Sequence, residues 1–242
     1  MRVLVIGRGG REHAIVWALS KSPKISKLFC APGNGGIAGL AECVPITELQ
    51  FEEISTFAKE QAIDLVMVAP DDPLAAGLVD HLESKGIAAF GPRANAAIIE
   101  GSKVFMKQLL KKYSIPTAAY ESFDAYEPAL AYLRSQTAPI VIKADGLAAG
   151  KGVTVAQTME EAEAALKDIM VGQVFGASAG ASVVIEEFLT GQEMSLLAFV
   201  DGSTVRLMVP SQDHKPVFDN DKGPNTGGMG TYSPLPHVPE SI

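Results

Sequence analysis

Short apolar runs alternate with helical periodicity over roughly the first hundred residues. Residues 3–6 and 65–68 are apolar runs that end in turns rich in glycine or proline, as buried strands of a parallel sheet do. Between such runs, apolar side chains recur at helical spacing, as at Ala14, Trp17 and Ala18. The pattern predicts strands over 3–6, 27–31, 65–68 and 87–90 and helices over 12–20, 51–61 and 73–85. This alternation predicts an α/β fold with a mainly parallel sheet and helices on both faces.

A second α/β segment follows a boundary that the sequence predicts at residues 114–116, where Pro116 disfavours helix in the residue before it. The pattern predicts helices over 103–112, 127–133 and 159–169, and strands over 140–143, 153–156, 182–186, 195–200 and 204–209. Asp201 and Gly202 lie between the last two strands, and Asp-Gly is typical of a tight hairpin turn. Residues 211–242 are expected to be largely loop.

The composition limits the classes of protein. Hydrophobic residues make up 47% of the chain and charged residues 20%, which is enough to form a core and excludes a mainly disordered chain. The formal net charge of −8 opposes binding to a phosphate backbone, so no nucleic-acid partner is expected. A length of 242 residues predicts one complete domain and a small or partial second one.

The cellular compartment can also be predicted. Two cysteines, Cys30 and Cys43, cannot form a disulfide framework, and a buried thiol is the ordinary occupant of the apolar run around Cys30. The first residues lack the features of a signal peptide, and no stretch has the ~20 apolar residues of a membrane helix. We expect a cytoplasmic protein without a membrane partner.

The segment Gly7-Arg8-Gly9-Gly10-Arg11-Glu12 follows the first predicted strand and partly matches a dinucleotide-binding fingerprint. The match fails at the third glycine, where Glu12 stands, and no acidic residue for a ribose ends the second strand. A plain structural turn and a site for a small phosphorylated substrate both remain open. The second interpretation is favoured, because backbone amides at a helix N-terminus bind phosphate groups.

A glycine-rich loop between two predicted strands carries Lys143 and Lys151. Its spacing differs from that of a P-loop, which also has a Ser or Thr after the lysine. Glycines let backbone approach a triphosphate closely, and lysines neutralise its charge. The segment therefore indicates a mobile nucleotide flap, although two solvated lysines beside a hairpin would give a similar pattern.

The strand over 182–186 ends in Glu186 and Glu187. These residues form either a solvated strand end or an adenine slot, in which Glu193 accepts hydrogen bonds from the ribose. Farther on, residues 211–230 are dense in polar side chains and glycine, and a long irregular stretch usually has a task. No pair of histidines has the spacing of metal ligands.

Taken together, these segments resemble the glycinamide ribonucleotide synthetase family of ATP-grasp ligases. The residues that carry the resemblance are Gly9 to Ala14, Ala31 to Asn34, Glu100 to Lys103, Pro139 to Val153, Val184 to Phe188, Gln212 to Lys215 and Gly223 to Gly230. The resemblance implies an N-terminal Rossmann-like (pre-ATP-grasp) domain over 1–101, an ATP-grasp lid over 123–190, and an incomplete central ATP-grasp domain made of 102–122 and 191–242.

The resemblance also implies the reaction. Members of the family ligate glycine to 5-phosphoribosylamine in purine biosynthesis, with ATP and Mg²⁺ (or Mn²⁺) as cofactors and glycyl phosphate as the intermediate. We expect a monomer that acts on these small molecules. The alternatives are another ATP-grasp carboxylate–amine ligase and a non-catalytic nucleotide-binding fragment. The family extends beyond residue 242, so we expect a truncated chain with a complete first domain and lid, and with its Mg²⁺ ligands beyond Ile242.

Family roles carry over to residues that match its motifs. The resemblance implies catalytic roles for Lys151, Asp213 and Lys215; nucleotide contacts for Lys103, Lys143, Gly146, Lys151, Glu186, Glu187, Leu189 and Glu193; and substrate contacts for Gly10, Asn34, Asp71, Asp213, Thr226, Gly227 and Gly228. Asp71 stands where the family usually has glutamate, so its carboxylate reaches one methylene less far.

Overall fold

The structure is a computed structural model that describes residues 1–147, 152–176, 179–220 and 222–238. The chain divides into two compact units, Met1–Pro116 and Thr117–Ile242. The division falls in the segment where Pro116 predicts a break. Each unit has its own core, so each is described separately.

Unit 1 is built on a five-stranded parallel sheet with the strand order β3-β2-β1-β4-β5. Its strands are β1 (Arg2–Gly7), β2 (Lys27–Pro32), β3 (Glu42–Cys43), β4 (Leu65–Val68) and β5 (Ala89–Phe90). Its helices are α1 (Gly10–Ser20), the 3-10 helix η1 (Ile37–Gly39), α2 (Phe51–Glu60), α3 (Asp71–Ala75), α4 (Leu78–Ser84), α5 (Ala94–Gly101) and α6 (Lys103–Lys112). The predicted parallel α/β domain is confirmed.

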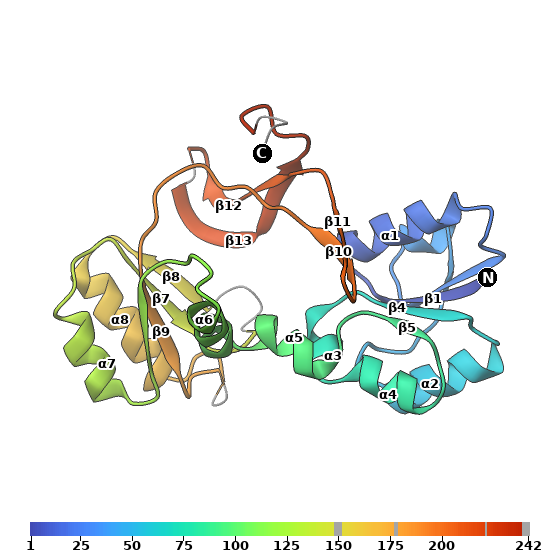
Figure 1. Ribbon diagram of the computed structural model, residues 1–242, viewed down its shortest axis with the longest axis horizontal. Coiled ribbons are helices and arrows are strands. Elements are labelled where there is room, and N and C mark those ends of the chain that lie inside the picture. The colour runs from blue at the N-terminus through green and yellow to red at the C-terminus, as the bar shows by residue number, and fades with distance from the viewer. Residues whose placement is uncertain (148–151, 177–178, 221, 239–242) are drawn as a thin grey trace. The chain divides into compact units, whose positions relative to one another are not determined.

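The central strand β1 is buried on both faces, which explains its continuous apolar sequence. Leu4 and Ile6 pack in one cluster with side chains of α2 and α4, and Val3 and Val5 pack in another with Val16 of α1. Figure 1 shows α1 on one face of the sheet and α2 and α4 on the other. The two layers hold the carboxyl ends of the strands at one edge, where the turns of the candidate site begin.

One helix of unit 1 differs from its prediction. The single helix expected over 73–85 is two helices, α3 and α4, because Gly77 adopts a left-handed conformation with φ of 90° between them. Glycine adopts this conformation without steric cost, and the helical spacing of apolar residues on either side hides the break. The prediction of one continuous helix was therefore wrong.

Unit 2 contains a four-stranded antiparallel sheet with the order β6-β9-β7-β8. Its elements are β6 (Tyr120–Phe123), α7 (Tyr126–Leu133), β7 (Ile140–Ala144), β8 (Val153–Ala156), α8 (Met159–Met170) and β9 (Val183–Glu187). One face packs on α7 and α8, which lie together on the same side of the sheet (Figure 1). The lid boundary predicted at residue 123 falls on the last residue of β6, and the division into lid and central domain stays a prediction.

Two hairpins complete unit 2. The first joins β10 (Ala198–Asp201) to β11 (Thr204–Leu207) through Gly202 and Ser203, as the Asp-Gly sequence predicts. The second joins β12 (Gln212–Phe218) to β13 (Lys222–Tyr232). The expectation that residues 211–242 are largely loop was therefore wrong. Register shifts and glycines interrupt β12 and β13, so the sequence lacks the alternation of apolar and polar residues that predicts a strand.

None of the helices within the described part of the chain has both the length and the apolar composition needed to cross a membrane.

Candidate functional site

The turns that follow β1, β2 and β4 lie together at one edge of the parallel sheet. The amide of Gly33 donates to Gly7 O at 3.1 Å, so the first two turns are joined by backbone. Arg11 Nη1 lies 3.6 Å from Asp71 Oδ1, which joins the first turn to the third. The structure thus assembles a candidate ligand site in unit 1 from segments far apart in the sequence.

The first turn is closed around a buried glutamate, Glu12. Its Oε2 atom accepts a hydrogen bond from the amide of Gly9 at 2.6 Å. A Cβ added to Gly7, which has φ of +125°, would lie 2.4 Å from Glu12 Cγ and 2.9 Å from Pro70 Cγ. The side chain at position 12 therefore fills the space that a dinucleotide-binding turn keeps open with its third glycine, and its charge opposes a pyrophosphate.

Asn34 holds two of these turns in place. Its Oδ1 accepts from the amides of Gly36 and Ile37 at 2.8 and 2.9 Å, and its Nδ2 donates to Arg8 O at 2.8 Å. The amide side chain, predicted as a substrate contact, thus forms structural hydrogen bonds on both of its polar atoms. Within the described ranges Nδ2 donates to one acceptor, so its second N–H can be offered to a ligand.

The other predicted residues of unit 1 are near this edge or on the following helices. Gly10 begins α1, and a Cβ added there would meet nothing within 4 Å. Asp71 begins α3, and its side chain is 49% exposed. Lys103 begins α6, directly after the N-cap residue Ser102. The structure brings Gly10, Asn34 and Asp71 together through the three turns.

Cys30 lies beneath the first turn, where its thiol donates to Gly7 O at 3.3 Å. Burial raises the pKa of the Cys30 thiol to about 12, with smaller contributions from Cys43 and Glu12. Cys30 is therefore a structural core residue, in agreement with its place in an apolar run.

A second candidate site lies on the antiparallel sheet of unit 2. Lys143 of β7 forms an ion pair with Glu186 of β9, and their side chains are 27% and 5% exposed. Lys143 pairs with Val184 in register and Glu186 pairs with Val141, so the two charged residues lie on one face of the sheet. Side chains alternate between faces, and the intervening residues Ile142 and Ile185 pack against the helices. The lysine and the carboxylate therefore belong to the face that α7 and α8 leave uncovered.

The remaining nucleotide candidates surround these strands. Glu187 Oε1 accepts from the amide of Ala119 at 2.8 Å, so this carboxylate joins β9 to the segment before β6. Leu189 is 63% exposed. Gly146 has φ of +90° and leads into the predicted flap. Lys151 lies outside the described residues.

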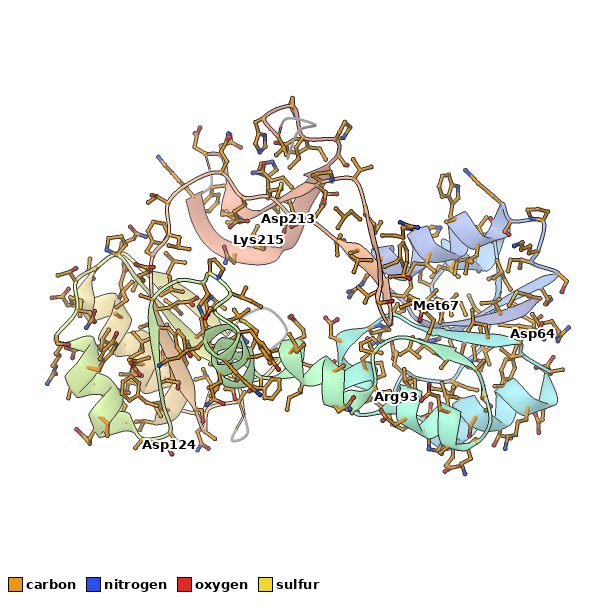
Figure 2. The ribbon with its side chains drawn as sticks, viewed as in Figure 1. Asp64, Met67, Arg93, Asp124, Asp213 and Lys215 are labelled. Carbon is orange, nitrogen blue, oxygen red and sulfur yellow. The ribbon has the colours of Figure 1, made fainter. Side chains whose placement is uncertain are left out.

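A third group of predicted residues comes together on the hairpin of β12 and β13. Lys215 Nζ donates to Asp213 Oδ1 at 3.0 Å and to Glu193 Oε2 at 3.2 Å. Figure 2 shows Asp213 and Lys215 on β12. Thr226 Oγ1 donates to Lys215 O at 2.8 Å and accepts from the amide of Gly228 at 3.0 Å. The structure thus joins the predicted catalytic residues Asp213 and Lys215 to Glu193, which the sequence analysis assigned to the ribose.

The two carboxylates determine the charge of Lys215. Burial alone would lower the pKa of Lys215, but the hydrogen bonds to Asp213 and Glu193 outweigh burial and hold it above the ordinary value of 10.5. Lys215 is therefore a fixed cation at physiological pH and is unsuited to accepting a proton.

Replacing Lys215 by glutamine should lower the melting temperature at pH 8, and the loss should fade as the pH rises above about 10.5. A raised pKa in the folded state stabilises the fold fully below the unfolded pKa, and this contribution is lost as the lysine deprotonates. Because the side chain is 44% exposed, the effect at pH 8 should be about 1 kcal/mol or less. Thermal unfolding of both proteins at pH 8 and pH 11 measures it. An equal difference at both pH values would contradict the ion-pair origin.

The sequence missed one residue of the first turn, Glu12. The sequence did contain a signal for it, because Glu12 stands where the dinucleotide fingerprint has its third glycine. A side chain at that position must occupy the turn.

Residues 101–242, which contain the Lys143–Glu186 pair and the β12–β13 hairpin, match the family model described as "Phosphoribosylglycinamide synthetase, ATP-grasp (A) domain". Residues 1–100 match the N domain of the same synthetase. The chain therefore belongs to the phosphoribosylglycinamide synthetase family, and the resemblance found in its sequence is confirmed.

Individual relatives agree with this family. The chain is 55% identical over 236 residues to a phosphoribosylamine–glycine ligase of Halalkalibacterium halodurans, covering 98% of this chain and 55% of the relative. It is 56% identical over 243 residues to the ligase of Listeria monocytogenes, covering 100% of this chain and 58% of the relative. The crystal structure of the Thermotoga maritima ligase aligns with a TM-score of 0.82 and 34% identity over 99% of this chain and 56% of that one. The chain thus spans a little over half the length of these relatives.

Proposed function

We propose that this chain provides the sugar-phosphate, nucleotide and glycine sites of a cytoplasmic, monomeric ligase that joins glycine to 5-phosphoribosylamine. The observation that carries the proposal is that two consecutive domain models of one synthetase family match residues 1–242 in order. The geometry described above adds support, because the predicted residues gather into three groups instead of being scattered.

The reaction takes place in two steps. The glycine carboxylate attacks the γ-phosphorus of ATP, which breaks the bond to the bridging oxygen and gives glycyl phosphate and ADP. The amine of phosphoribosylamine then attacks the acyl carbon, displaces phosphate and loses a proton. The product is glycinamide ribonucleotide. Because an acyl phosphate hydrolyses readily, the site must exclude water during both steps.

The roles of the residues follow from their chemistry. Lys103, Lys143 and Lys151 neutralise the phosphates of ATP, and the glycines from Gly146 onward let the flap approach them. Glu186, Glu187, Leu189 and Glu193 hold the nucleoside. Asp213 and Lys215 lie at the reacting centre, and Thr226, Gly227 and Gly228 contact glycine there. Gly10, Asn34 and Asp71 form the phosphoribosylamine site.

The family implies Mg²⁺ or Mn²⁺, which would neutralise charge on the transferred phosphoryl group. Among the described residues, no group of three or more histidine, cysteine, aspartate or glutamate side chains is placed to hold a metal ion. The described side chains alone do not form a metal site, so no step above passes through the metal.

The proposal is tested with a chimera. Residues 1–242 replace the matching part of the Listeria monocytogenes relative, which is 56% identical to this chain. The chimera should release phosphate from ATP only when glycine and phosphoribosylamine are both present. A second chimera with Lys143→Met serves as the control and should release phosphate much more slowly at limiting ATP. A folded chimera that is inactive beside an active parent, or that uses a different acid or amine, would overturn the proposal.

A further inference from the structure

The first turn of unit 1 contains a buried carboxylate oxygen that accepts no hydrogen bond. Glu12 is 4% exposed, and Oε2 is occupied by the amide of Gly9. The other oxygen, Oε1, is buried and accepts no hydrogen bond from the part of the chain that the structure describes. A buried carboxylate oxygen without a donor is costly, and such atoms in native proteins usually have a role.

Arg11 lies against this oxygen without bonding it well. Its Nε is 3.4 Å from Glu12 Oε1, and its Nη1 is 3.6 Å from Asp71 Oδ1. Both distances exceed the range of a good hydrogen bond, and the arginine side chain is 61% exposed. Loose contacts of an exposed side chain contribute little to stability. Arg11 can therefore move away from Glu12 at small cost.

The same turn attracts anions on its outer side. Gly9 is the N-cap of α1 and has no side chain, so the N-cap residue offers no side-chain acceptor to the first-turn amides. These amides and the Arg11 guanidinium favour an anion. The carboxylate of Glu12 keeps that anion away from the interior of the turn. The arrangement therefore fits a ligand that carries an anion and, a few ångströms away, a hydrogen-bond donor.

We infer that Glu12 is a substrate-contacting residue: its Oε1 accepts a hydrogen bond from a ribose hydroxyl of the sugar phosphate after Arg11 has turned from Glu12 to the phosphate. This inference rests on the proposed function, which supplies the sugar phosphate. The donor is a hydroxyl and not the amine, because a carboxylate beside an amine favours its protonated form. A protonated amine cannot attack the acyl phosphate.

The inference is tested by calorimetric titration of the 242-residue chain with ribose 5-phosphate and with inorganic phosphate at low salt. Glu12→Gln keeps an acceptor for Gly9 but places an amide nitrogen, which cannot accept, at the second position. Its affinity for ribose 5-phosphate should fall about tenfold or more. Its affinity for inorganic phosphate should be unchanged or higher, because a negative charge has been removed.

Two further variants complete the design. Arg11→Ala should weaken both ligands, because the guanidinium binds the phosphate they share. Glu42→Gln, which removes an exposed ion pair with Lys27 on the same sheet, should change neither. The fluorescence of Trp17, the single tryptophan of the chain and a residue of α1, verifies that each variant is folded.

The outcomes separate the hypotheses. If Glu12→Gln binds ribose 5-phosphate as the wild type does, or loses both ligands equally, Glu12 only shapes the turn and the inference is overturned. If Arg11→Ala leaves phosphate affinity unchanged, the inference that Arg11 turns to the phosphate is contradicted. A wild-type chain that binds neither ligand overturns the sugar-phosphate site as well. The variants could show the expected pattern of ribose 5-phosphate binding while the chimera is inactive. That result would overturn the proposed ligase reaction but would still support the role of Glu12.

Discussion

Replacing Lys143 by methionine is expected to weaken ATP binding about 10- to 100-fold, the loss expected for a charge-assisted contact to phosphate. The same change should destabilise unit 2. Lys143 forms an ion pair with Glu186, whose side chain is only 5% exposed. Breaking a buried ion pair by removing one charge costs up to about 3–5 kcal/mol. Titration with a fluorescent ATP analogue measures the first effect, and hydrogen exchange of the β7 and β9 amides measures the second.

A double variant separates these two effects. Lys143→Met combined with Glu186→Gln removes both charges, so the sheet should regain most of its stability. ATP affinity should stay low, because the ammonium group that we propose neutralises phosphate is still missing. Full recovery of ATP binding in the double variant would show that Lys143 has only a structural role.

The second large effect is expected at the first turn of unit 1. Gly7→Ala should lower the free energy of unfolding of unit 1 by about 3 kcal/mol or more. The added Cβ would lie 2.4 Å from Glu12 Cγ, and φ of +125° is unfavourable for any residue with a side chain. Urea denaturation followed by the fluorescence of Trp17, the only tryptophan, reports on this unit alone.

Gly10→Ala is the matched control, three residues away in the same turn. A Cβ at Gly10 meets nothing within 4 Å. Gly10 is also the first residue of α1, where alanine is the better helix former. This variant should be as stable as the wild type or slightly more so. Equal destabilisation by both substitutions would mean that the turn rejects any side chain and that the contact with Glu12 is not the cause.

Most of the fold could be predicted because its signals are local. The apolar run of β1 and the helical spacing of α1 each lie within about ten residues, and they identify a parallel α/β unit. The break at Gly77 could not be predicted, because a left-handed glycine between two helices leaves the spacing of apolar residues intact. The β12–β13 hairpin was missed for a related reason, since its irregular register removes the alternation that marks strands.

The candidate site was predictable in composition and less so in geometry. The sequence identified Lys143 and Glu186 individually, but their pairing depends on the register between β7 and β9, which no local pattern specifies. The sequence likewise identified Asn34 without its hydrogen bonds to Arg8 and Ile37, which depend on how two turns meet. Long-range contacts of this kind follow from the folded chain and not from the motif.

The separate cores of the two units have a consequence for how the protein is made. Both cores of unit 1 consist only of residues between Val3 and Ala97, so all the side chains that form them are synthesised before unit 2. Domains of this kind fold in sequence order as the chain leaves the ribosome. Unit 1 is therefore expected to be complete while the strands of unit 2 are still being translated. The three turns of its candidate ligand site then exist before the candidate nucleotide site of unit 2 does.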